Sequence, residues 1–165
     1  MSTGGVSLLA QFFSAGARFA NRRGIYAGRR FTKVHVRCYR WSNGRIGGHI
    51  PGRRDARILL LDHVGAKSGV RRTSPLVYIT DGAVTAVAAS KAGQPTHPAW
   101  LHNLLAQPHT TIQLGARSCR VRVRLANASE REQLWRRFVE TVPDYKFYQQ
   151  HGGPRTIPIV ILEPR

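Results

Sequence analysis

From residue 31 onwards, the apolar residues of this chain fall into short runs that are separated by turn-forming residues. Short runs with β-branched residues or with alternating apolar and polar positions are typical of strands. Such runs lie within residues 31–41, 57–64, 74–80, 83–90, 110–114, 118–127 and 156–163. Asp81-Gly82 and the glycine at position 115 mark hairpin turns between neighbouring runs. The pattern therefore predicts six or seven short strands.

Two longer segments have the spacing and end signals of helices. Pro98 suits the first turn of a helix over residues 98–107, which Pro108 ends. We expect Ser129 and Glu132 to form a capping box at the start of a second helix, over residues 130–141. One helix inserted midway and another before the last strand predict an α+β fold, mainly β. The expected architecture is a small β-barrel with peripheral helices in one domain.

The N-terminal segment, residues 1–30, differs from the expected folded domain, residues 31–165. Its apolar residues recur at helical spacing and are followed by four arginines within residues 21–30. Two interpretations stay open: a helix that caps the barrel, or a helix that lies on an anionic membrane. The chain has no run long enough to span a membrane and no charged region before its apolar N-terminal stretch. We expect a cytoplasmic protein, peripheral on the inner face of the cell membrane under the second interpretation.

The charge of the chain predicts an anionic partner. Twenty-six lysines and arginines against eight acidic residues give a net charge of +18. Nucleic acid, an anionic membrane and a polyanionic small molecule all fit this charge. The strands lack a cluster of aromatic residues for base stacking, which argues against specific nucleic-acid binding. The histidines and the two cysteines, Cys38 and Cys119, lack metal-ligand spacing, so we expect no metal site and reduced thiols.

The stretch GAKSGVRRTSPL, residues 65–76, places much of this charge in a turn between two strands. Its glycines allow a sharp turn and a close approach of the backbone to a ligand. Lys67, Arg71 and Arg72 together with nearby hydroxyl groups can bind a phosphodiester or carboxylates through charge-assisted hydrogen bonds. The spacing is not that of a P-loop. A solvated basic hairpin is the alternative interpretation.

Six motifs occur in order along the chain: GAKSG, RTSPL, AASKAG, HPAWLHNL, YKFY and RTIPIV. In this combination the chain resembles the deazaflavin-dependent nitroreductase family of the split-barrel flavin-binding fold, over roughly residues 35–164. The resemblance implies a split β-barrel and an oxidoreductase that uses reduced coenzyme F-420. Such an enzyme transfers a hydride to a flat electrophilic acceptor such as a quinone, an enone or a nitroaromatic. The phosphodiester and oligoglutamate tail of this coenzyme would match the basic turn.

The resemblance also implies roles for individual residues. By matching position, the cofactor-binding residues would be Ala66, Lys67, Ser68, Arg72, Thr73, Ser74, Pro75, Leu76, Val77, Ala88, Ala89, Ser90, Lys91, Ala99, Trp100, Asn103 and Tyr145. Catalytic roles, as proton donors or in polarising the acceptor oxygen, would fall to Tyr145, Ser90 and Tyr148, with solvent as an alternative proton source. We expect Trp41 and Trp135 to be packing residues.

Three positions depart from the family pattern. Ala66 stands where an arginine is common, and Ser74 where an asparagine is common. Val142 stands where some members that reduce nitroimidazoles have a tyrosine, which leaves the acceptor open. Two other classes also stay open: a basic nucleic-acid-binding module, and a split barrel that binds FMN or haem. The absorption spectrum of the purified protein would show whether it is a split barrel that binds FMN or haem.

Overall fold

A closed antiparallel β-barrel forms the centre of the molecule. The computed structural model describes residues 29–165. The strands are β1 (His49–Ile50), β2 (Arg53–Val64), β3 (Arg71–Asp81), β4 (Val84–Ala88), β5 (His109–Leu114), β6 (Arg117–Leu125) and β7 (Ile159–Pro164). They follow the order β1-β2-β3-β4-β7-β6-β5, and an additional pairing of β2 with β5 closes six of them into a barrel. The expected α+β, mainly β barrel is confirmed.

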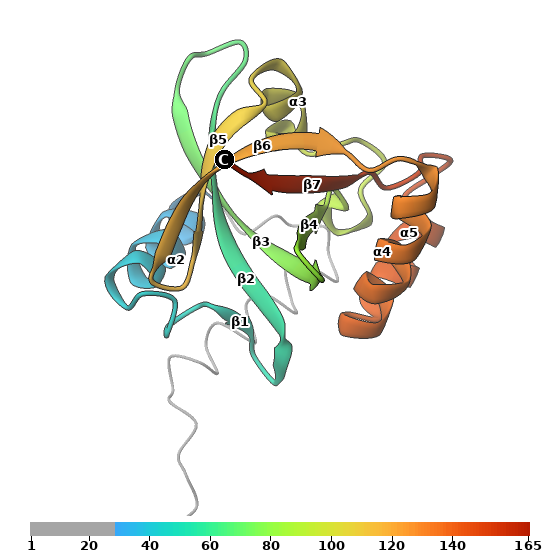
Figure 1. Ribbon diagram of the computed structural model, residues 1–165, viewed down its shortest axis with the longest axis horizontal. Coiled ribbons are helices and arrows are strands. Elements are labelled where there is room, and N and C mark those ends of the chain that lie inside the picture. The colour runs from blue at the N-terminus through green and yellow to red at the C-terminus, as the bar shows by residue number, and fades with distance from the viewer. Residues whose placement is uncertain (1–28) are drawn as a thin grey trace, which may run out of the picture.

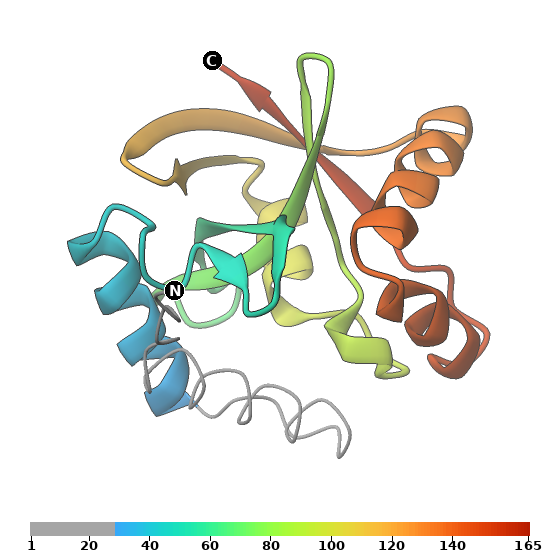
Figure 2. The ribbon, with the colours of Figure 1, turned by 90° about the horizontal axis from the view of Figure 1, so that it is seen from below.

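The helices lie around this barrel on different sides. They are α2 (Arg29–Trp41), α3 (Ala99–Ala106), α4 (Ala128–Thr141) and α5 (Asp144–His151), with a short 3-10 helix η1 (Lys91–Gly93). Helix α2 lies on one flank, while α4 and α5 lie together on the opposite flank (Figures 1 and 2). The predicted midway helix is confirmed as α3, which follows Pro98 directly. Within the described residues, no helix combines the length and apolar character needed to cross a membrane.

Two hydrophobic cores stabilise the molecule, one on each side of the barrel wall. The inner core is built from alternate residues of the strands and from α3, with Leu59, Leu61 and Trp100 among its members. The outer core fills the space between the sheet and helices α4 and α5, with Phe138 and Ile159 among its members. Successive residues of a strand point to opposite faces, so β3 and β4 contribute to both cores. The barrel wall is thus buried on both faces where it carries several of the predicted site residues.

The prediction of a strand over residues 31–41 is wrong, because this segment is helix α2. Its buried side follows a helical period, with Tyr39 only 1% exposed, whereas Val34 of the apparent strand pattern is 51% exposed. The Tyr39 hydroxyl donates a hydrogen bond to Ile58 O at 2.9 Å and accepts one from Gly115 N at 2.9 Å. These contacts attach α2 to the barrel and outweigh the strand propensity of its β-branched residues. Trp41, expected to pack, is 83% exposed at the end of α2.

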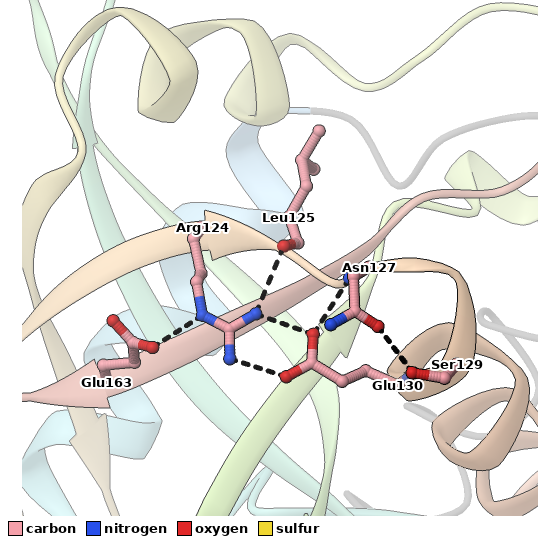
Figure 3. Close-up of polar contacts among 6 residues, drawn as sticks. All are labelled: Arg124, Leu125, Asn127, Ser129, Glu130 and Glu163. Carbon is pink, nitrogen blue, oxygen red and sulfur yellow. Dashed lines mark hydrogen bonds and ion pairs between the residues drawn. The ribbon is translucent and has the colours of Figure 1, made fainter.

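The prediction of a capping box at Ser129 and Glu132 is also wrong, by two residues. Asn127 is the N-cap of α4, and its side chain accepts a hydrogen bond from Glu130 N, while the Glu130 carboxylate accepts one from Asn127 N. Asn127 is as good an N-cap as serine. The Glu130 carboxylate also forms a bidentate ion pair with Arg124 of β6, at 2.7 Å for each bond (Figure 3). Because Glu130 also binds Arg124, the capping box forms at Asn127 and Glu130, two residues before the predicted position.

Arg124 joins three elements through two carboxylates. Its Nε donates to Glu163 of β7 at 2.6 Å, and the other two nitrogens bond Glu130 of α4 (Figure 3). The hydrogen bonds from Arg124, and then the one from Asn127 N, lower the pKa of Glu130 to about 2. Arg124 therefore links the start of α4 to the barrel through a carboxylate that stays ionised in mild acid.

Nearly all of the predicted N-terminal segment, residues 1–28, lies outside the described residues. The two cysteines lie in α2 and β6, and both are free thiols.

We predict that the Glu130→Gln variant is less stable than the wild type at pH 7, but not at pH 2. The pKa of Glu130 is depressed in the folded state, so its stabilising effect is present above the unfolded value of 4.5. That effect is lost as the pH falls from about 4.5 towards about 2. Thermal melts across pH 2–7 would measure it. Glu132→Gln on the same helix is the matched control, and an equal, pH-independent loss in both variants would contradict the prediction.

Candidate functional site

The basic stretch forms the tight turn between β2 and β3 that its glycines predict. Gly65 N donates to Val70 O at 2.9 Å, and Gly69 N donates to Gly65 O at 2.8 Å. Gly69 has a φ of +64°, a left-handed conformation that favours glycine at this position. Lys67 and Ser68 at the tip are exposed. The turn therefore presents its charge to solvent on a compact backbone.

Asn103 of α3 joins this turn to the barrel. Its Oδ1 accepts a hydrogen bond from Ala66 N at 2.9 Å, and its Nδ2 lies 2.8 Å from His63 Nδ1. The Nε2 of His63 lies 3.0 Å from Ser74 Oγ. These contacts bring together three predicted site residues, Ala66, Ser74 and Asn103. The histidine that joins two of them was not among the predicted site residues. Asn103 and His63 are the two buried polar residues of the described chain, at 8% and 7% exposed.

The surroundings of His63 favour its neutral form by lowering its pKa. Burial lowers its pKa below the ordinary 6.5, the positive charge of Arg72 lowers it further, and Asp62 opposes both effects. The neighbouring Asp62 points the other way, where Arg40 Nη2 and Thr73 Oγ1 bond its Oδ1 at 2.9 and 2.6 Å. Asp62 and His63 therefore face opposite sides of the strand.

The loop after β4 is held by Arg155 of the RTIPIV motif. The Arg155 guanidinium donates to Ser90 O at 2.5 Å, to Gln94 O at 2.8 Å and to Ala89 O at 3.3 Å. Within this loop, Lys91 has a positive φ of 50°. A non-glycine residue in this conformation is uncommon and needs support from its surroundings. The motif was recognised in the sequence, but nothing there indicated that its arginine binds three carbonyl groups 61–66 residues away.

The two tyrosines of the YKFY motif have different surroundings. Tyr145 is 6% exposed in the outer core, with its ring centroid 5.2 Å from that of Phe138 and 5.7 Å from that of Tyr148. Tyr148 is half-buried and lies beside the loop after β4, because a Cβ on Gly93 would lie 3.1 Å from its Cα. Tyr148 therefore borders the Ser90 loop, and Tyr145 packs against Tyr148 in the outer core.

The other predicted site residues divide between the two faces of the wall. Leu76, Ala89 and Trp100 belong to the inner core, and Val77 and Ala88 to the outer core. Lys91 Nζ donates to Thr96 Oγ1 at 2.6 Å. The exposed or half-buried remainder is Arg72, Thr73, Pro75 and Ala99. Among residues 29–165, no group of three histidine, cysteine or acidic residues is arranged to hold a metal ion.

Comparison with known proteins identifies the family of this chain. A family model described as F420H2-dependent quinone reductase matches residues 31–164. An F420H2-dependent quinone reductase of Mycobacterium tuberculosis is 34% identical over 142 residues, covering 85% of this chain and 94% of that protein.

Two solved structures are also similar. One, described as an F420-H2 dependent reductase, is 37% identical with a TM-score of 0.59 and covers 64% of this chain and 93% of its own. The other, described as a domain-swapped dimer, is 33% identical with a TM-score of 0.61, covering 79% and 95%.

We predict that Arg155→Met destabilises the protein by about 2 kcal/mol, because three carbonyl groups lose a charged donor. Arg155→Lys should recover only part of this loss, since a single ammonium group cannot reproduce the guanidinium geometry. Urea denaturation would measure the stability, and hydrogen exchange of residues 90–94 would measure the loop. Arg136→Met, an exposed arginine on α4, is the control. Equal effects of Arg155→Met and Arg136→Met would contradict the assigned role.

Proposed function

The chain belongs to the F420H2-dependent quinone reductase family, and from this premise we propose that it transfers a hydride from reduced coenzyme F-420 to a quinone. The observation that carries the proposal is the family match, which extends over residues 31–164 and includes every predicted site residue. The enzyme is thus an oxidoreductase. The quinone is the acceptor that the relatives' descriptions favour, ahead of enones and nitroaromatics.

The basic turn fits the anionic part of this coenzyme. Lys67 and Arg72 have no carboxylate partner among residues 29–165, so an arriving anion displaces no internal ion pair. We assign the phosphodiester and tail to these two side chains and to the hydroxyl groups of Ser68 and Ser74. The Thr73 hydroxyl instead bonds Asp62 on the opposite face of the strand. The same charges attract a polyanion from a distance.

The deazaflavin ring is assigned to the surface between this turn and the loop after β4. We assign one wall of this surface to residues 75–77 of β3 and residues 88–91 after it. Their side chains alternate between the two cores, so the ring would meet these segments partly through their backbone. The other wall is assigned to Ala99, Trp100 and Asn103 of α3. Tyr145 lies in α5 and helps to hold this helix against the outer core. Small alanine side chains allow a flat ring to approach the strand closely.

When bound, the reduced coenzyme supplies the hydride, and the protein orients the two reactants. Ser90 and Tyr148 border the same loop, so they are the groups best placed to bond the acceptor oxygen and supply a proton. Tyr145 is packed in the outer core, and we assign it a supporting role behind Tyr148, with a direct role in closing over the ring as the alternative. Val142 is 4% exposed at the end of α4, in the same core.

We predict that the Lys67→Ala/Arg72→Ala double variant binds coenzyme F-420 at least tenfold more weakly than the wild type, because two charge-assisted contacts are lost. Quenching of the coenzyme's fluorescence would measure the affinity, and stopped-flow oxidation by a quinone would measure hydride transfer. Arg120→Ala/Arg122→Ala removes the same charge from the exposed face of β6 and is the control. If both double variants bound the coenzyme equally weakly, the effect would come from net charge alone, and the assignment of the turn would be contradicted. No binding by the wild type at low salt would end the proposal.

We also propose that the protein contacts the inner face of the cell membrane peripherally, where lipid-soluble quinones lie. Val34 and Trp41 are 51% and 83% exposed on α2, and their spacing of seven residues puts them on one face of the helix. Arg37 on the same helix and Arg45 shortly after its end are also exposed. An aromatic side chain with adjacent positive charge is typical of a surface that lies on anionic lipid.

We predict that Trp41→Ser reduces co-flotation with vesicles containing phosphatidylserine several-fold, because the exposed aromatic anchor is lost. Deletion of residues 1–28 should reduce it further if the predicted N-terminal segment also contacts lipid. Leu125→Ser, a change at an apolar side chain 45% exposed on the end of β6, is the control. Flotation that is the same in all variants, or absent in the wild type, would contradict membrane contact.

A further inference from the structure

A hydrogen-bonded series of three side chains crosses the end of the barrel next to the basic turn. It runs from Asn103 of α3 through His63 of β2 to Ser74 of β3. In the register of β2 and β3, Leu61 pairs with Ser74 and His63 pairs with Arg72, so these residues share one face of the sheet. His63 and Ser74 are diagonal neighbours on that face.

The orientation of the Asn103 amide is determined by its partners. Ala66 N–H can only donate, so the Asn103 atom 2.9 Å away must be the carbonyl oxygen. The Nδ2 of Asn103 is then a donor directed at His63 Nδ1, 2.8 Å away. His63 Nδ1 must accept this bond, and it therefore carries no hydrogen.

This determines the tautomer of His63 and the role of Ser74. A neutral imidazole whose Nδ1 accepts carries its hydrogen on Nε2, and Nε2 donates to Ser74 Oγ at 3.0 Å. Ser74 Oγ thus accepts from the protein and still has its own hydrogen to donate. Within the described residues, Ser74 Oγ makes no other hydrogen bond. Ser74 is half-buried, and the exposed Arg72 lies two residues away on the same face.

We infer that His63 is a positioning residue that directs the Ser74 hydroxyl hydrogen at an oxygen of the bound coenzyme, beside Arg72. This inference rests on the proposed function. The oxygen belongs either to the phosphodiester or to the deazaflavin ring, and both are hydrogen-bond acceptors. His63 acts through Ser74 and does not touch the coenzyme itself.

The first test needs no coenzyme. Long-range nitrogen–proton NMR of the wild-type protein at pH 7.5 reports the protonation state of each imidazole nitrogen. We expect His63 to be neutral with its hydrogen on Nε2. A hydrogen on Nδ1, or an imidazolium, would overturn the inference.

The second test measures coupling between His63 and Ser74. We expect His63→Leu and Ser74→Ala each to weaken binding of coenzyme F-420 about tenfold, and the double variant to bind no more weakly than either single variant. His63→Gln should restore affinity, because its amide can accept from Asn103 and donate to Ser74. His109→Leu, an exposed histidine on β5, is the control, and thermal melts report folding.

The outcomes distinguish this inference from the function on which it rests. Additive effects of His63→Leu and Ser74→Ala, or failure of His63→Gln to restore affinity in a folded protein, overturn the inference alone. Absence of binding by the wild type overturns the proposed function and the inference with it. The deazaflavin riboside without phosphodiester and tail identifies the oxygen: a tenfold loss in Ser74→Ala with this compound places it on the ring. A loss confined to the complete coenzyme places it on the phosphodiester.

Discussion

The pairing of β2 with β5 is the contact on which the candidate site depends. It consists of two residue pairs, Leu60 with Gln113 and Leu61 with Ile112, and it closes the barrel. Because α3 directly precedes β5, closure brings α3 to the end of β2, where Asn103 reaches residues 37 and 40 positions away. Thr110 of β5 adds a hydrogen bond to the carbonyl oxygen of Asp62. Closure of the barrel therefore brings the turn, α3 and the polar end of the barrel together.

Local signals in the sequence predicted the strands, the hairpins and α3, because apolar alternation, glycine turns and terminal prolines each act within a few residues. The strand predicted over residues 31–41 failed because the contacts of Tyr39 with β2 and with the turn between β5 and β6 decide the conformation of that segment. The basic turn was predicted from its own residues, and the other site residues were predicted from the family resemblance. The role of His63 was not predicted, because its partners Ser74 and Asn103 are 11 and 40 residues away in the sequence.

Half of the acidic residues of this cationic protein join elements through ion pairs. Four of the eight, Asp62, Asp81, Glu130 and Glu163, form ion pairs with arginines of α2, α4 and β6. These pairs lie on the outer side of the barrel wall, and none involves Lys67 or Arg72. Structural charge is thus neutralised locally, whereas Lys67 and Arg72 on the turn have no carboxylate partner among residues 29–165. Salt should weaken binding at the turn far more than it weakens the fold.

The position of β7 has a consequence for biosynthesis. The last strand of the chain pairs with β4 on one side and with β6 on the other, so it completes the middle of the sheet. Until the ribosome releases these residues, the nascent polypeptide exposes two unpaired strand edges, and the loop after β4 lacks Arg155. Contacts this distant in sequence also slow folding. The unfinished barrel is therefore prone to aggregation until β7 is in place, and a variant without residues 159–164 would lack the strand that joins β4 to β6.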